Sequence, residues 1–115
     1  PFTLLAYPPE TIFAEKLYIA VKKKGQNTRM KDYYDLSKLA DHSLDQRKLK
    51  ECIEKTFTNR NLPLATQIQF KSEELVRLQV YWEHFLKRDK MENLPPTIAE
   101  MIEKVNAFLK TVYER

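Results

Sequence analysis

The sequence predicts an all-α protein, a bundle of about five helices preceded by one short strand. Three observations lead to this prediction. Apolar residues recur at helical spacing in successive segments, proline-containing or polar joints separate these segments, and only one glycine occurs in 115 residues. We expect residues 1–9 to form the strand and a linker, and residues 10–115 to form one helical domain.

The predicted strand is the apolar run from Phe2 to Tyr7, which is rich in β-forming residues and ends at Pro8 and Pro9. A strand needs a partner with which to exchange backbone hydrogen bonds. We therefore expect it to be left over from a sheet domain that lies upstream and is missing from this chain.

The first predicted helix runs from Glu10 to Lys24, and the second runs from Lys31 to about His42. A basic loop, Gly25 to Met30, joins them. Prolines precede the first helix and lysines fill its last turn, where cations suit the helix dipole. The glycine that follows is a usual helix stop.

Three further helices follow with the same periodicity. Asp45 can cap the third helix, Ser72 opens the fourth, and the fifth follows Pro95 and Pro96. Their expected inner residues are Leu49, Ile53 and Phe57, then Leu75, Leu78, Trp82, Phe85 and Leu86, then Ile98, Met101, Ile102, Val105, Phe108, Leu109 and Val112.

The composition is that of a globular protein, with 43% hydrophobic and 31% charged residues. A net charge of +4 and a pI near 9.2 suit an anionic ligand such as a nucleotide or RNA without requiring one. No apolar run is long enough for a membrane span. A lone cysteine, Cys52, excludes an intrachain disulfide and suits the cytoplasm. A single glycine excludes glycine-rich phosphate loops.

Two charged residues stand where the apolar pattern calls for hydrophobic ones. Lys16 lies among Ile12, Ile19 and Ala20, and Asp32 shares the inner face of the next helix. A charge on an inward face is costly unless it is paired or used. Lys16 and Asp32 are therefore the leading candidates for chemistry.

Three neighbours extend this candidate site. Asp35 lies three residues after Asp32 at the margin of the same face, so the two carboxylates can share a ligand. Arg29 and Lys31 flank the start of that helix, where backbone amides and two cations can bind an anion.

The pattern leaves other interpretations open. Lys16 can be a lysine whose ammonium reaches water, or a structural ion pair with Asp32 in a helical interaction module. Residues 22–24 with Arg29, Lys31 and Arg60 also suggest a small RNA-binding domain. Tyr33 and Tyr34 can stack on a base, although such residues are more often core at one position and rim at the other.

The segments 7–17 and 28–36 together resemble the back half of the AbiEii/AbiGii nucleotidyltransferases, the toxin components of abortive-infection type toxin–antitoxin systems. The shared pattern is alanine-glutamate-lysine at 14–16, then arginine at 29, lysine at 31, and aspartate-x-x-aspartate at 32–35. Residues 56–60 and 82–85 show weaker similarity to the tail of the family.

This resemblance implies a polymerase-β-like nucleotidyltransferase. In such proteins a sheet domain carries a glycine-serine motif and the acidic residues that hold Mg²⁺, and a helical half supplies a lysine and an aspartate. Lys16 matches the lysine that contacts the nucleoside triphosphate, and Asp32 matches the aspartate needed for activity. Asp35 and Arg29 match supporting positions, and Lys31 lies beside them. A cognate antitoxin and, for some members, a tRNA acceptor are implied partners.

The chain also departs from that pattern, because it contains no glycine-serine motif and no upstream pair of carboxylates. We therefore expect it to be the C-terminal helical half of a transferase that is inactive alone, with Mg²⁺ bound mainly by residues absent from this chain.

Overall fold

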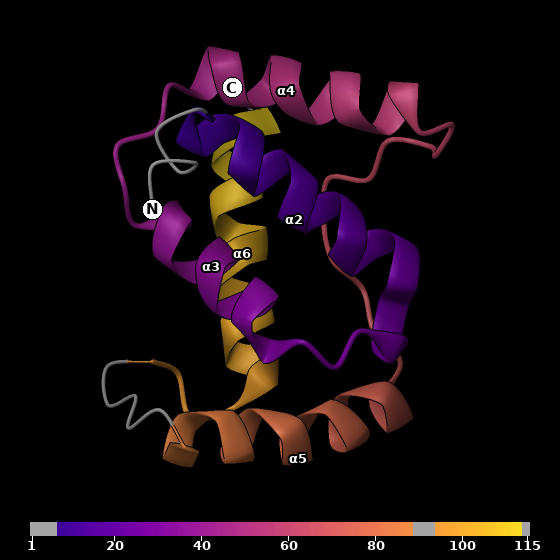
Figure 1. Cartoon of the computed structure of the whole chain (residues 1–115), viewed down its shortest axis with the longest axis vertical. Coiled ribbons are helices and arrows are strands. Elements are labelled where there is room, and N and C mark those ends of the chain that lie inside the picture. The colour runs from indigo at the N-terminus through magenta and orange to yellow at the C-terminus, as the bar shows by residue number, and fades with distance from the viewer. Residues whose placement is uncertain (1–6, 89–93, 114–115) are drawn as a thin grey trace.

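The computed structural model describes residues 7–88 and 94–113. These residues form five α-helices and one turn of 3₁₀ helix, and no strand occurs among them (Figure 1). The elements are α2 (Pro9–Lys23), η1 (Lys24–Gln26), α3 (Met30–Ala40), α4 (Gln46–Asn59), α5 (Ser72–Arg88) and α6 (Ile98–Tyr113). The all-α prediction is confirmed for this part of the chain. The predicted strand lies outside the described residues except for Tyr7, which is an exposed bend residue.

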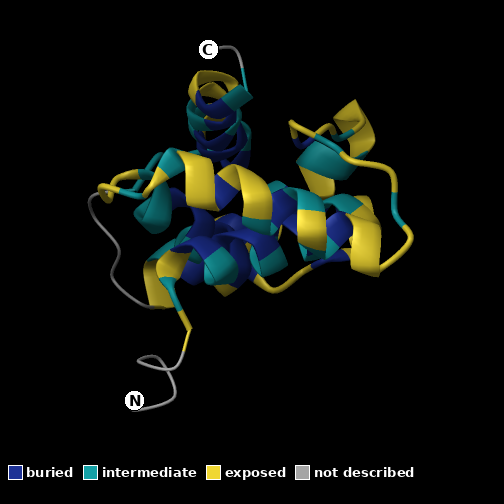
Figure 2. Cartoon of the chain, turned by 90° about the horizontal axis from the view of Figure 1, so that it is seen from above, coloured by how far each residue is buried: buried dark blue, intermediate teal, exposed yellow. Residues whose placement is uncertain are grey.

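The helices pack in crossing directions around one core. In Figure 1, α4 and α5 lie at opposite ends of the molecule, and α6 runs between them. α2 packs on both α3 and α4, while α3 also packs on α6 and α5. Figure 2 shows that buried residues gather between the helices and that exposed ones cover the outer faces. This arrangement places α2 and α3, which carry the candidate site, side by side.

α2 begins and ends much as its sequence predicts. Pro8 is the extended residue before the helix, and Pro9 occupies the first helical position, where its missing N–H costs nothing. The Glu10 carboxylate accepts a hydrogen bond of 3.0 Å from the Asp45 backbone N–H, which ties the start of α2 to the start of α4. At the other end α2 stops at Lys24, which has a φ of 52° and is the first residue of η1.

α3 runs from Met30 to Ala40, close to the predicted bounds, and His42 lies beyond it as an exposed residue. Asp45 caps α4 as predicted, because its Oδ1 accepts a 3.1 Å hydrogen bond from the Lys48 N–H.

Large side chains fill the space between the helices. Trp82, Leu49, Ile53 and Leu109 are completely buried. Trp82 also satisfies its indole N–H by donating to the Pro95 carbonyl at 2.9 Å. No helix in the described residues is long and apolar enough to cross a membrane.

Candidate functional site

The two charges predicted on inward faces meet between α2 and α3. Lys16 Nζ lies 2.9 Å from Asp32 Oδ1 and 3.3 Å from Asp35 Oδ2. The Asp32 side chain is 1% exposed, whereas those of Lys16 and Asp35 are 22% and 21% exposed. The ammonium therefore stands at the rim of the site, with a buried carboxylate beneath it and a half-buried one beside it.

Both oxygens of Asp32 have positively polarised partners. Lys16 donates to Oδ1, and Asn27 Nδ2 donates to Oδ2 at 3.3 Å. Arg29 Nε lies 3.9 Å from the same Oδ2. Burial alone raises the pKa of the Asp32 carboxyl, but the Lys16 ammonium, the Asn27 amide and the Arg29 charge together outweigh it and lower the pKa. Asp32 is thus a stable carboxylate.

The same balance holds Lys16 in its charged form. Burial lowers the pKa of its amine, but hydrogen bonds and attraction from Asp32, and then from Asp35, raise the pKa above its ordinary value. The amine is consequently protonated at neutral pH and fixed in position by two acids.

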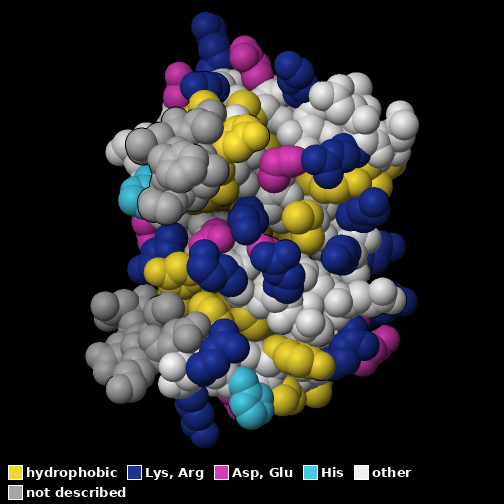
Figure 3. Space-filling model, viewed as in Figure 1, with side chains coloured by type: hydrophobic (Ala, Val, Ile, Leu, Met, Phe, Trp, Pro, Cys, Tyr) yellow, Lys and Arg dark blue, Asp and Glu magenta, His cyan; other side chains and the backbone are white. Residues whose placement is uncertain are grey.

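Arg29 and Lys31 lie on the solvent side of this cluster. Lys31 Nζ donates to both oxygens of Asp35, at 3.1 and 3.3 Å. The side chains of Arg29 and Lys31 are 72% and 67% exposed. With Lys16 they give three cations against two carboxylates, so the cluster keeps positive charge toward solvent. Figure 3 shows Lys and Arg side chains gathered across the middle of one face, with acidic side chains among them.

Asn27 is a site residue that the sequence reasoning did not identify. Its side chain is buried, and besides donating to Asp32 it accepts a 3.2 Å hydrogen bond from the Arg29 N–H. The Tyr33 hydroxyl donates to the Asn27 carbonyl at 3.3 Å. An asparagine two residues before a backbone N–H that it can bind is a common turn element, and this signal could have drawn attention to it.

Hydrogen bonds from α5 also fix the loop between α2 and α3, and the sequence analysis did not predict them. The Gly25 N–H donates to Glu74 Oε2 at 3.2 Å, and Arg77 donates to the Gly25 carbonyl. A hydrogen bond from the Lys71 N–H is the main reason why the pKa of Glu74 is lowered. α5 therefore holds the loop that carries Asn27 and Arg29.

Other candidate residues have structural roles. Tyr33 is fully buried against Phe70, and Tyr34 is half-buried, so these two residues are core and rim respectively. Arg60 donates to both oxygens of Glu15 at 2.6 and 2.8 Å and lies over the Tyr18 ring, which ties α4 to α2.

The cluster does not fit a magnesium ion by itself. Among residues 7–88 and 94–113, no group of three or more acidic, histidine or cysteine side chains is placed to hold a metal. Asp32 is unsuited for a further reason, because both of its oxygens are already engaged by cationic or N–H donors.

On two consecutive helices, a buried acid fixes a lysine at the rim of a basic cluster. This arrangement is suited to phosphate recognition. Comparison with known protein families identifies the family of the chain. The model of the nucleotidyl transferase AbiEii toxin, Type IV TA system, matches residues 1–108. The chain belongs to this family of nucleotidyltransferase toxins of toxin–antitoxin systems. Membership implies a nucleoside triphosphate substrate and an antitoxin partner. Searches of curated proteins and of solved structures gave no match.

Proposed function

We propose that this chain is the helical half of a site that transfers a nucleoside monophosphate from a nucleoside triphosphate to an acceptor. The observation that carries the proposal is the Lys16 ammonium, which two acids hold at 2.9 and 3.3 Å while 22% of the side chain stays exposed. A fixed amine at the edge of a basic cluster binds a triphosphate strongly, because partial burial reduces screening by water.

Lys16 would contact the β- and γ-phosphates of the nucleotide. Arg29 and Lys31, both largely exposed, would add charge on the solvent side. A guanidinium can bind two phosphate oxygens at once, whereas an ammonium acts as a point charge. These three residues would therefore share the phosphates rather than bind three separate groups.

Asp32 and Asp35 would have different tasks. Asp32 is buried and engaged at both oxygens, so it would act as a positioning residue that keeps Lys16 and Arg29 in place. Asp35 is partly exposed and contacts both Lys16 and Lys31, so it is the carboxylate that an incoming substrate can reach. An incoming phosphate would compete with Asp35 for the two ammonium groups.

The remaining parts of the reaction would come from outside this chain. Magnesium ligands and a glycine-serine motif belong, in the family pattern, to a sheet domain, and the Lys16 cluster does not fit the ion. We assign the chain no activity by itself. A tRNA end, implied for some family members, is the acceptor to test first.

The test uses the full gene product, with a growth assay in cells and transfer of label from α-labelled nucleoside triphosphates in vitro. Lys16→Met should abolish toxicity and lower transfer by about a hundredfold, as expected when a group that stabilises transferred charge is removed. Retained toxicity at normal expression would refute the role of Lys16.

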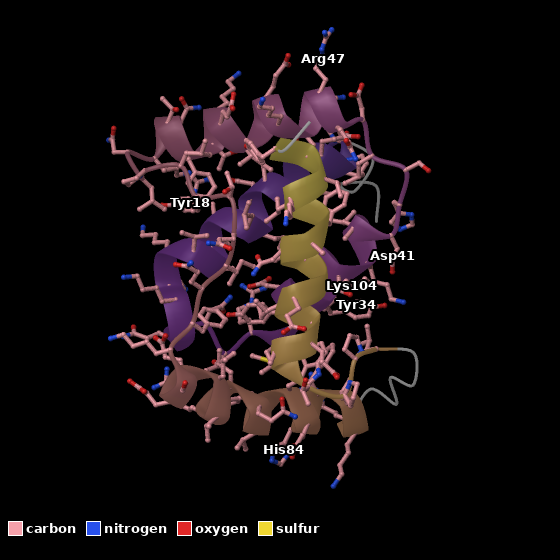
Figure 4. All side chains as sticks on the ribbon, turned by 180° about the vertical axis from the view of Figure 1, so that it is seen from behind. Tyr18, Tyr34, Asp41, Arg47, His84 and Lys104 are labelled. Atoms are coloured by element: carbon pink, nitrogen blue, oxygen red, sulfur yellow. The ribbon has the colours of Figure 1, made fainter. Side chains whose placement is uncertain are left out.

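Lys104→Met is the matched control. Lys104 on α6 donates to Asp41 at 2.7 Å and to Ser37 at 3.0 Å, so it is another lysine that bridges two helices (Figure 4). This variant should keep its activity. Lys16→Met/Asp32→Asn, which removes both charges of the buried pair, should be inactive even where it is as stable as the control.

The alternative is that the Lys16–Asp32 pair only holds α2 and α3 together within an interaction module. The burial of Asp32 and its complete pairing favour this alternative. Under it, the double variant would retain full transfer activity.

A further inference from the structure

The loop between α2 and α3 is bonded to α5 at one residue, Gly25. The Gly25 N–H donates to Glu74 Oε2 at 3.2 Å, and the Arg77 guanidinium donates to the Gly25 carbonyl. We propose that Glu74 and Arg77 are positioning residues for phosphate binding, because they fix the loop that ends at Arg29. The inference rests on the proposed function and deepens it. Neither residue lies in the segments that carry the family resemblance.

The contact with α5 explains why residue 25 is a glycine, the only one in the chain. The turn itself does not require it, because the left-handed φ of 52° belongs to Lys24 and Gly25 has no positive φ. An added Cβ at Gly25 would lie 2.6 Å from Glu74 Cγ and 2.7 Å from Glu74 Cβ. Any larger residue would therefore push Glu74 away, so the glycine serves the close approach of α5 to the loop.

Glu74 is itself fixed at the start of α5. Its Oε1 accepts a 2.8 Å hydrogen bond from the N–H of Lys71, the residue before the helix. A glutamate in the first turn that bonds back to this N–H forms half of a capping box. Both carboxylate oxygens are thus bonded to backbone N–H groups, one in α5's own start and one in the loop. The carboxylate can therefore set the place of the loop.

The position of Arg29 depends on this loop more than on contacts of its own side chain. Its side chain is 72% exposed, and its Nε lies 3.9 Å from Asp32 Oδ2, which is long for an ion pair. Its backbone N–H, by contrast, is bonded to Asn27 Oδ1 at 3.2 Å. The course of the chain from Gly25 onward therefore decides where the guanidinium stands.

Two helices hold the loop. Tyr33 on α3 donates to the Asn27 carbonyl at 3.3 Å, and α5 holds Gly25. In Figure 1 the loop runs alongside α5, which packs on η1 as well as on α3. Without the bonds to Gly25, the loop would be fixed from α3 alone. Phosphate binding would then have to order it, and the conformational freedom lost in that step weakens binding.

The test combines transfer kinetics of the full gene product with binding of inorganic tripolyphosphate to the chain. Arg77→Met removes the donor to the Gly25 carbonyl and keeps an apolar stem. It should raise KM for the nucleoside triphosphate and weaken tripolyphosphate binding, each by about tenfold, while kcat changes by less than about twofold. The reason is that a residue which only positions binding groups affects substrate and transition state alike.

Arg47→Met is the matched control. Arg47 is an exposed residue of α4, at the end of the molecule opposite α5 (Figure 4). This variant loses the same charge and should keep the KM and the tripolyphosphate affinity of the wild type. Arg77→Lys keeps a cationic donor for a single carbonyl, so it should restore most of the affinity that Arg77→Met loses. No recovery in Arg77→Lys would contradict the proposal.

A single label reports the contact itself. Because Gly25 is the only glycine, labelling the chain with [¹⁵N]glycine gives one backbone amide signal. Hydrogen exchange of this amide should be at least about tenfold faster in Arg77→Met and close to that of the wild type in Arg77→Lys. This measurement separates a loosened loop from a protein that has unfolded, because urea unfolding of the same sample shows whether the variant is folded.

Three results would overturn the proposal. They are unchanged exchange of the Gly25 amide in Arg77→Met, faster exchange with the KM and tripolyphosphate affinity of Arg47→Met, and a fall in kcat without a rise in KM. Lys16→Met separates this inference from the proposed function. If Lys16→Met binds tripolyphosphate as tightly as the wild type, the proposed function fails. If Lys16→Met loses binding and Arg77→Met keeps it, the positioning role alone fails.

Discussion

The ion pair between α2 and α3 predicts an unequal response to removal of its two partners. Lys16→Met leaves the Asp32 carboxylate buried, with only Asn27 and a more distant Arg29 at its oxygens. Removal of one partner of a buried pair costs about 3–5 kcal/mol, and these remaining contacts favour the lower end, about 3 kcal/mol. Asp32→Asn should cost less, about 1.5 kcal/mol, because Lys16 keeps Asp35 and reaches water.

The double variant Lys16→Met/Asp32→Asn removes both charges and leaves an amide that can still bond Asn27. It should lose about 2 kcal/mol, less than the two single losses together, which gives a coupling energy of about 2.5 kcal/mol.

Urea unfolding followed by the fluorescence of Trp82, the single tryptophan and a fully buried one, reports each free energy of unfolding. Additive losses, with a coupling energy below about 0.5 kcal/mol, would refute the pairing. A larger loss for Asp32→Asn than for Lys16→Met would refute the assignment of Asp32 as the buried partner.

Further predictions concern pH, the loop and its brace. The pKa of Asp32 is lowered in the folded protein, so the stability difference between wild type and Asp32→Asn should be constant at neutral pH and shrink as pH falls below the ordinary value of 3.8; a difference that grows in acid would contradict this. Asn27→Ala should cost about 2 kcal/mol, because it leaves the buried Asp32 short of a donor and the Arg29 N–H without its acceptor; Asn59→Ala, at the exposed last residue of α4, is the control in the same unfolding assay. Gly25→Ala should lose about 1–3 kcal/mol, since the new Cβ would lie 2.6 Å from Glu74 Cγ, and Glu74→Ala in the same chain should recover part of that loss; an unchanged urea midpoint for Gly25→Ala would show that Glu74 moves aside freely.

The centre of the site was predictable from the sequence because it depends on periodicity. Lys16 and Asp32 stand on the inward faces of consecutive helices, and a short loop brings such faces together. The all-helical architecture was predictable for the same reason, since each apolar stripe needs a neighbour.

The contacts that refine the site could not be predicted in this way. Glu74 binds Gly25 across 49 residues of sequence, and periodicity gives no distance between a loop and a remote helix. The ion pair between Lys16 and Asp35 depends on where α3 begins, and so does the hydrogen bond from the Arg29 N–H to the Asn27 side chain. That boundary is set by loop geometry that the sequence pattern specifies only to within a few residues.

The central claim is that Lys16 is an amine held ready for phosphate, and the most direct measurement follows its ammonium group. The ¹⁵N signal of Lys16 Nζ should be recorded by NMR while inorganic tripolyphosphate is added to the chain, with Lys104 Nζ as the internal reference. The account predicts a saturable shift for Lys16 and none for Lys104. A Lys16 signal that stays unchanged, or that moves only in parallel with Lys104, would contradict it.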